Sequence, residues 1–168
     1  TYEAMDELNK MRCAIKEFAP MEVAVRAADG ITMIPSSRDK TTLYEHGKRR
    51  FLEEAEILRR LQNVKAVVSI TDYFLENGTC YFVMEYLDGV TLKLLLKNIG
   101  GKLPLNQALP ILSELGTALE KVHKQCNIFH RDISPDNIII TKQGEVKLID
   151  FGNAKFIITD GQQQLSVV

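Results

Sequence analysis

The first half of the chain contains short runs in which apolar and polar positions alternate, a pattern typical of antiparallel strands. One such run covers residues 12–18. Two shorter runs, 22–27 and 31–34, flank an Asp-Gly pair that favours a hairpin turn. The runs 66–75 and 79–86 predict a second hairpin around an Asn-Gly pair.

A helix is predicted between the two hairpins. Phe51, Ala55 and Leu58 recur at helical spacing with charged residues between them, which predicts an amphipathic helix over residues 42–61. Thr42 and the glutamate three positions later match the capping-box pattern of a helix start. The first half should therefore be a small antiparallel sheet with one long helix.

The second half has a helical pattern. Residues 91–98 predict a short helix, and residues 105–126 predict a longer one. Apolar runs at 138–140 and 146–149 around a Gln-Gly turn predict a small hairpin. The apolar positions of the longer helix share one face: Leu105, Leu109, Leu112, Leu115, Leu119 and Val122.

The fold class that follows is α+β, with two small lobes. A chain of 168 residues is long enough for such a pair. The change from strand-rich to helix-rich sequence predicts a first lobe of residues 1–86 and a second lobe of residues 87–168, joined by a hinge.

Charge and cysteine content narrow the expected partners and location. The chain has 21 basic and 22 acidic side chains, so it lacks the basic excess of proteins that bind nucleic acid. Its three cysteines, Cys13, Cys80 and Cys126, are far apart and show no metal-ligand or disulfide spacing. We therefore expect a reducing, cytoplasmic location, either for a whole protein or for the cytoplasmic part of a membrane-anchored one.

Two motifs in the second half carry groups suited to catalysis. Residues 130–137 read His-Arg-Asp-Ile-Ser-Pro-Asp-Asn, and residues 150–152 read Asp-Phe-Gly, each at the edge of a predicted strand. The amide oxygen of Asn137 and the carboxylate of Asp150 are ligands that Mg²⁺ prefers. Asp132 remains to orient an attacking hydroxyl and accept its proton.

These motifs resemble the catalytic and metal loops of protein kinases, and the chain as a whole resembles the eukaryotic-like Ser/Thr kinases of bacteria. The resemblance implies a kinase fold, with an antiparallel-sheet N-lobe and a partial helical C-lobe that ends in the activation segment. It also implies ATP with Mg²⁺ or Mn²⁺ as cofactors, a protein substrate phosphorylated on Ser or Thr, and a role in signalling.

The same resemblance assigns ATP-binding residues in the first half. Lys16 matches the lysine that holds the α- and β-phosphates, and Glu54 matches the carboxylate that fixes this lysine. Met84 matches the gatekeeper at the back of the adenine pocket. Four further groups should contact adenine: the carbonyl of Glu85, the amide of Leu87, and the side chains of Ala14 and Ile139.

The resemblance also implies regulatory features. A packed stack that couples the helix to the Asp-Phe-Gly loop is expected from Leu58, Ile70, His130 and Phe151. His130 is thus expected to be a core residue rather than an acid or base. Arg131 matches the arginine that pairs with a phosphorylated activation-segment residue, for which Thr159 and Ser166 are the hydroxyl residues present.

One position departs from the family pattern and leaves alternatives open. Ser134 stands where Ser/Thr kinases usually have a lysine, and a hydroxyl supplies no charge to the transferred phosphoryl group. A non-catalytic nucleotide-binding or scaffolding domain is therefore an alternative. A small-molecule kinase of the aminoglycoside or choline type is another, which Arg131 and the intact Asp-Phe-Gly argue against. An active kinase is favoured because the other key residues are all present: Lys16, Glu54, Asp132, Asn137 and Asp150.

The resemblance also predicts what lies outside this sequence. It places a glycine-rich loop before Thr1 and the substrate-binding helices after Val168. We therefore expect the chain to be part of a longer kinase and to be inactive alone, because the face that those helices cover would be exposed.

Overall fold

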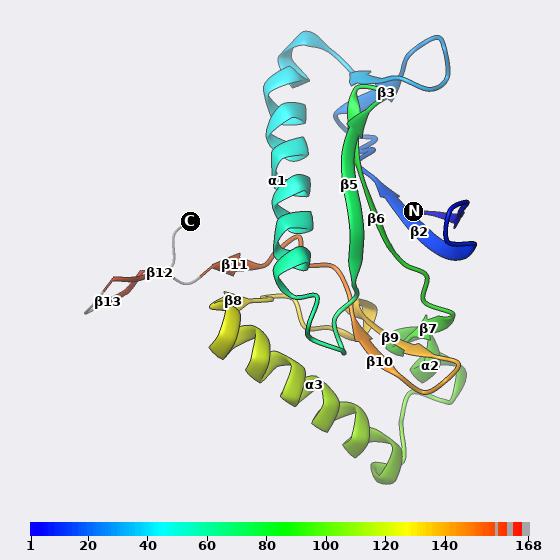
Figure 1. The fold of residues 1–168 in the computed structure, drawn as a ribbon, viewed down its shortest axis with the longest axis vertical. Coiled ribbons are helices and arrows are strands. Elements are labelled where there is room, and N and C mark those ends of the chain that lie inside the picture. Colours follow the sequence, from blue (N-terminus) through cyan, green and yellow to red (C-terminus); the bar gives the residue numbers. More distant parts are fainter. Residues whose placement is uncertain (157, 161–162, 166–168) are drawn as a thin grey trace. The chain divides into compact units, whose positions relative to one another are not determined.

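The computed structural model describes residues 1–156, 158–160 and 163–165, and it divides the chain into two compact units (Figure 1). The first unit contains Thr1–Arg59 and Ser69–Tyr86, and the second contains Arg60–Val68 and Leu87–Val168. The sequence pattern had placed residues 60–68 in the first lobe. They group with the second unit because the Leu148 amide donates to the Ala66 carbonyl (2.7 Å) and the Leu148 carbonyl accepts from the Val68 amide (3.0 Å).

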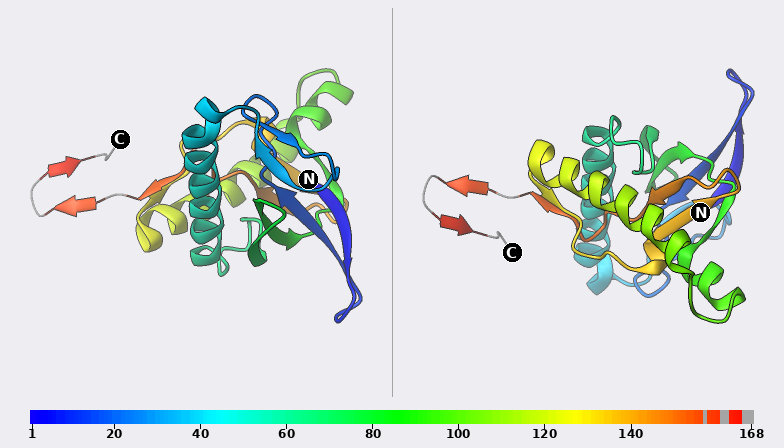
Figure 2. Two further views of the ribbon diagram at one scale, coloured as in Figure 1. Left: turned by 90° about the horizontal axis from the view of Figure 1, so that it is seen from above. Right: turned by 90° about the horizontal axis from the view of Figure 1, so that it is seen from below.

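The first unit is built on a four-stranded antiparallel sheet in the order β1-β2-β6-β5. Its strands are β1 (Tyr2–Asp6), β2 (Met11–Glu17), β5 (Ile70–Glu76) and β6 (Thr79–Glu85). Both residues of the predicted Asn-Gly turn have positive φ, 50° at Asn77 and 73° at Gly78, as a tight hairpin turn requires. Figure 2 shows that the β1–β2 hairpin projects beyond the other two strands.

A second, short hairpin follows β2. It consists of β3 (Ala24–Arg26) and β4 (Met33–Pro35), as the Asp-Gly pair between them predicted. The Asp29 carboxylate caps the turn by accepting from the amides of Ile31 and Thr32, both at 2.8 Å. The hairpin buries Ala24 and Met33 against Tyr44, with Phe18 and Val23 packed around them. This apolar cluster packs the β3–β4 hairpin against the helix that follows.

Helix α1 (Thr41–Arg60) confirms the long helix predicted for the first half. A 3-10 turn, Arg38–Lys40, leads into it, so Thr42 lies within the first turn rather than before it. The apolar face of α1 packs on the sheet, where the rings of Phe51 and Phe82 lie 4.8 Å apart (Figure 1). The same face carries the buried Glu54.

The second unit combines two helices with a small sheet. The helices are α2 (Leu92–Asn98) and α3 (Leu105–Cys126), and the sheet order is β10-β9-β7. Thr91 caps α2 by accepting from the Leu94 amide at 3.2 Å. The strands of this unit are β7 (Gly89–Thr91), β8 (Ile128–Phe129), β9 (Ile138–Thr141), β10 (Val146–Leu148), β11 (Lys155–Phe156), β12 (Ile158–Asp160) and β13 (Gln163–Leu165).

The apolar stripe of α3 is buried over only part of its length. Leu115 and Val122 are buried, whereas Leu105, Leu109 and Leu112 are 71%, 54% and 62% exposed. The periodicity thus predicted the helix correctly. Among the residues that the structure describes, none fully covers these three leucine side chains in the first half of α3, which face solvent. None of the described helices is both long enough and apolar enough to cross a membrane.

Candidate active site

In the first unit, a lysine on the sheet is paired with a glutamate on the helix. Lys16 lies on β2, and its ammonium is 2.8 Å from Oε1 and 3.0 Å from Oε2 of Glu54 on α1. The Glu54 side chain is 6% exposed and that of Lys16 is 29% exposed. A buried carboxylate is costly without a cationic partner, and here the partner holds both of its oxygens. The ammonium is thereby fixed in place while part of the lysine side chain remains accessible.

The same sheet carries three of the predicted adenine-contacting residues. Ala14 on β2 lies directly opposite Met84 on β6, and the next pair in register is Cys13 with Glu85. The end of β6 is held by Ser69, which accepts from the Glu85 amide (3.0 Å) and donates its own amide to the Glu85 carboxylate (2.8 Å). The other two predicted residues, Leu87 and Ile139, belong to the second unit.

In the second unit, His130 links the two predicted catalytic loops. Its Nδ1 accepts from the Asp132 amide at 3.2 Å, and its Nε2 is 3.2 Å from the Ile149 carbonyl. These bonds require a neutral ring that is protonated on Nε2. Burial lowers the pKa of His130 below the usual histidine value, although the Ile149 carbonyl and nearby carboxylates act in the opposite direction. The ring also packs edge-on against Phe151, 4.5 Å away.

Asn137 and Asp150 present oxygens near this link. The buried Asn137 donates its side-chain amide to the Asp132 carbonyl at 3.0 Å, which leaves its amide oxygen as the acceptor end. Its main-chain carbonyl accepts from the Ile149 amide at 2.9 Å, so the two loops are joined a second time. Asp150 accepts from the Gly152 amide at 3.2 Å through one carboxylate oxygen.

Two residues of these loops have left-handed backbone. The φ angles are 68° at Arg131 and 61° at Asp150. Such conformations are costly for residues other than glycine and persist where the surroundings impose them, often at functional sites. The hydrogen bonds around His130 and Asn137 supply that constraint here.

Sequence reasoning did not single out Asn153. Its side-chain amide donates to Oδ2 of Asp132 at 3.3 Å. The only available sequence signal was an amide residue immediately after Asp-Phe-Gly, which by itself is typical of a turn.

A model of the protein kinase domain matches residues 24–168 of the chain. The chain belongs to the protein kinase domain family.

Relatives of this chain include bacterial Ser/Thr kinases. A Clostridium perfringens protein described as a probable serine/threonine-protein kinase is 43% identical over 107 residues, covering 64% of this chain and 15% of that protein. Serine/threonine-protein kinase PknA of Mycobacterium tuberculosis is 40% identical over 113 residues, covering 64% of this chain and 26% of that protein.

A solved structure also matches the chain. PpkA-294 in its apo form aligns with a TM-score of 0.84 at 30% identity, covering 90% of this chain and 53% of that chain. The family and the kinase-like α+β fold expected from the sequence are therefore confirmed. The chain spans only part of each of these relatives.

The expected regulatory stack divides between the two units of the chain. Leu58 and Ile70 are buried in the first unit, and His130 and Phe151 are buried in the second. The interpretation of His130 as a core residue agrees with its 1% exposure. Of the two hydroxyl residues considered as phosphorylation sites, Thr159 lies in β12, whereas Ser166 lies outside the described residues.

Ser134, the departure from the kinase pattern, lies immediately before the 3-10 turn Pro135–Asn137. Its carbonyl accepts from the Asn137 amide at 3.0 Å, so its backbone helps to shape the loop that positions Asn137. The half-buried side chain is short and uncharged. It contributes no cation to this loop.

The oxygen donors suit a magnesium ion held mainly by other ligands. Within the part of the chain that the structure describes, no three His, Cys, Asp or Glu side chains are grouped as a metal site. Asn137 and Asp150 could provide two protein oxygens for the ion, with water and phosphate oxygens completing its shell. Mg²⁺ is commonly bound in this way, because it loses its waters reluctantly.

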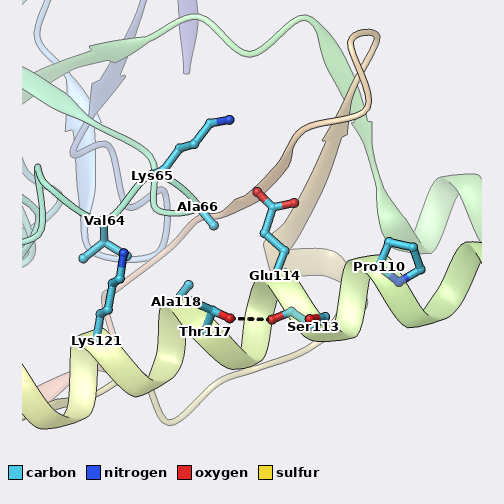
Figure 3. A pocket seen from close by; sticks show the side chains of 9 residues that line it. All are labelled: Val64, Lys65, Ala66, Pro110, Ser113, Glu114, Thr117, Ala118 and Lys121. Atoms are coloured by element: carbon cyan, nitrogen blue, oxygen red, sulfur yellow. Dashed lines mark hydrogen bonds between the residues drawn. The ribbon is translucent and has the colours of Figure 1, made fainter.

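A pocket of about 360 Å³ lies in the second unit (Figure 3). It is formed by α3 and residues 64–66, and its lining carries charges of both signs, from Lys65 on the short segment and from Glu114 and Lys121 on α3. The Thr117 hydroxyl in its wall donates to the Ser113 carbonyl at 3.0 Å. The pocket contains none of the predicted site residues. It is lined by Val64, Lys65, Ala66, Pro110, Ser113, Glu114, Thr117, Ala118 and Lys121.

Proposed function

We propose that the full-length protein transfers the γ-phosphoryl group of ATP to Ser or Thr hydroxyls of protein substrates. The observation that carries this proposal is the Lys16–Glu54 pair, with the lysine ammonium 2.8 Å from the carboxylate, in a chain that also retains Asp132, Asn137 and Asp150. The names of the relatives support Ser/Thr specificity.

Lys16 would hold the nucleotide phosphates. Glu54 orients the ammonium, so a third N–H group can point to a phosphate oxygen without the entropy cost of ordering a flexible side chain. The rings of Phe51 and Phe82, 5.6 Å and 5.2 Å from the ammonium, form an apolar background that strengthens its electrostatic interactions. Ala14, Met84, Glu85, Leu87 and Ile139 would contact the adenine ring.

Asp132 would act as the catalytic residue that receives the substrate hydroxyl. Its main chain is held at both ends, since the amide donates to His130 and the carbonyl accepts from Asn137. A carboxylate on so constrained a backbone can orient the hydroxyl and accept its proton as the phosphoryl group moves.

Asn137 and Asp150 would hold Mg²⁺, or Mn²⁺, which has similar ligand preferences. When bound, the ion would neutralise charge on the phosphate oxygens. The chain's own contribution is to keep the two oxygen donors on adjoining loops, which the bond between the Ile149 amide and the Asn137 carbonyl joins at 2.9 Å.

The proposed setting is cytoplasmic, with membrane anchoring, if present, outside these residues. The ground for this proposal is the sequence, in which Cys13, Cys80 and Cys126 are far apart and show no disulfide spacing. The proposed partners are ATP and a protein substrate.

The test compares full-length wild-type protein with Asp132→Asn, using labelled ATP and generic protein substrates. We expect wild-type transfer to Ser or Thr, and a loss of about 10²- to 10⁴-fold in kcat for Asp132→Asn with nucleotide affinity retained. The matched control is Asp72→Asn, the same change at an exposed position on β5. Equal transfer by Asp132→Asn and wild type would refute the role of Asp132.

A non-catalytic nucleotide-binding domain is the second candidate, and Ser134 is the observation that favours it. The same assay separates the two. ATP binding by the full-length wild type, with no transfer in Mg²⁺ or Mn²⁺, would establish the second candidate.

A further inference from the structure

We propose that Asn153 is a positioning residue for phosphoryl transfer, holding the Asp132 carboxylate in the orientation that receives the substrate hydroxyl. This inference rests on the proposed function and extends it to a residue that the kinase motifs do not include. The contact that carries it joins Nδ2 of Asn153 to Oδ2 of Asp132 at 3.3 Å.

The backbone around both residues is fixed by one short ladder. β8 and β11 pair antiparallel, with Phe129 opposite Lys155. Asp132 follows β8 by three residues and Asn153 precedes β11 by two, so the same ladder places both side chains. The contact lies within one compact unit.

Asn153 is itself held in a tight turn. The Ala154 amide donates to the Phe151 carbonyl at 2.9 Å, which closes a turn over residues 151–154. Phe151 is buried against His130, and the Asp150 carboxylate accepts from the Gly152 amide. The amide of Asn153 is therefore presented from a constrained backbone.

The physical effect of the contact is to select which of the two Asp132 carboxylate oxygens is presented to the substrate. Rotation about the last side-chain bond of an aspartate would otherwise exchange its two oxygens, since that torsion is broad and roughly two-fold. With Oδ2 occupied by the Asn153 amide, Oδ1 is the oxygen presented to the hydroxyl. The Asn153 amide is neutral, so it holds the Asp132 carboxylate without adding a positive charge to the site. Ser134 also supplies no charge there.

A purely local role for Asn153 makes a different prediction. Asn and Asp are both well suited to turns, so Asn153→Asp should be harmless if only the turn matters. If Asn153 positions Asp132, the same change removes a donor and places a second carboxylate about 3 Å from the first, where like charges repel strongly.

The kinetic test uses the full-length protein with Asn153→Asp and Asn153→Ala. We expect kcat to fall by about 10- to 100-fold for the aspartate variant and by several-fold for alanine, with the KM for ATP and the thermal midpoint close to wild type. Asn106→Asp, the same change at an exposed site on α3, is the matched control. Wild-type kcat in both Asn153 variants of an active enzyme would overturn the inference.

A spectroscopic arm keeps the inference testable if the wild type transfers no phosphate. The side-chain amide of Asn153 is identified by NMR as the asparagine signal absent from Asn153→Ala. We expect that signal to shift in Asp132→Ala and to stay in place in Asp136→Ala, which changes another acidic residue of the same loop. An unchanged Asn153 signal in Asp132→Ala would refute the contact. A shifted signal in an inactive wild type would confirm the contact but refute the proposed function, and with it the role of Asn153 in transfer.

Discussion

The ammonium of Lys16 lies 2.8 Å and 3.0 Å from the two carboxylate oxygens of Glu54, a residue 38 positions away in the sequence. The pair joins the middle of the sheet to the buried face of α1. Because Glu54 on α1 fixes the ammonium, Lys16 is placed to bind phosphate only when the helix is in this position.

Glu54→Gln should therefore weaken ATP binding with little loss of fold. Glutamine keeps the shape of the side chain but removes the charge that fixes Lys16, and we expect a rise in the ATP dissociation constant on the order of tenfold. Calorimetric titration of the full-length protein measures it. Glu45→Gln is the control, since Glu45 lies on the same helix, its side chain is 54% exposed, and it pairs with Lys48 at 3.1 Å. Equal affinities of Glu54→Gln and Glu45→Gln would contradict the prediction.

Glu17 should contribute stability to the first unit in a pH-dependent way. Its Oε2 accepts from the Tyr2 hydroxyl (2.8 Å) and from Arg26 (2.6 Å), and its Oε1 accepts from the Tyr81 hydroxyl (3.0 Å). Burial acts to raise the pKa of Glu17, but Arg26 and the two hydroxyls prevail and hold it below the usual value. The stabilisation is thus present above the unfolded-state pKa and is lost as the pH falls through the folded-state pKa.

The variant Glu17→Gln tests this by urea unfolding. At pH 7 it should lower the free energy of unfolding by about 1–3 kcal/mol, because it loses charged hydrogen bonds in a site where the side chain is 3% exposed. The difference from wild type should begin to narrow as the pH falls below the ordinary glutamate pKa of about 4.3, and it should close only as the pH falls through the lowered folded-state pKa, where Glu17 becomes uncharged. A difference that does not depend on pH would count against the ionised network.

His130 should make stability fall on mild acidification. Burial lowers its pKa, so its contribution is complete above the ordinary histidine pKa of about 6.5 and is lost as the pH falls towards the lowered value. Protonation of Nδ1 would also end its bond from the Asp132 amide. His130→Phe keeps a ring beside Phe151 but makes neither hydrogen bond.

We expect His130→Phe to unfold at lower temperature than wild type at pH 7.5 and to show a weaker dependence of the midpoint between pH 7.5 and 5. The measurement is thermal unfolding across that range. The reference is His46→Phe, a change at an exposed position on α1. If the thermal midpoint of His130→Phe depends on pH as steeply as that of wild type, a group other than His130 causes the pH dependence.

Elements with a strong local pattern were predictable. The helix predicted over residues 105–126 is α3 (Leu105–Cys126), and the hairpin predicted around Asn77-Gly78 joins β5 to β6. By contrast, β1 (Tyr2–Asp6) was not predicted, because most of its residues are exposed and its pairing with β2 supplies the pattern that its own sequence lacks. The assigned roles of the adenine-contacting and metal-binding residues stay predictions.

The amino-acid order by itself determined the helices, the hairpins and the kinase motifs, because periodicity, turn residues and fixed motif spacings act over a few positions. The kinase resemblance already implied that Glu54 pairs with Lys16, and the tertiary structure shows the contact; tertiary structure alone decided that residues 60–68 join the second unit through Leu148 and that Asn153 reaches Asp132. Each of these contacts forms only when segments distant in the chain are brought together, which depends on the packing of the whole unit rather than on any local pattern.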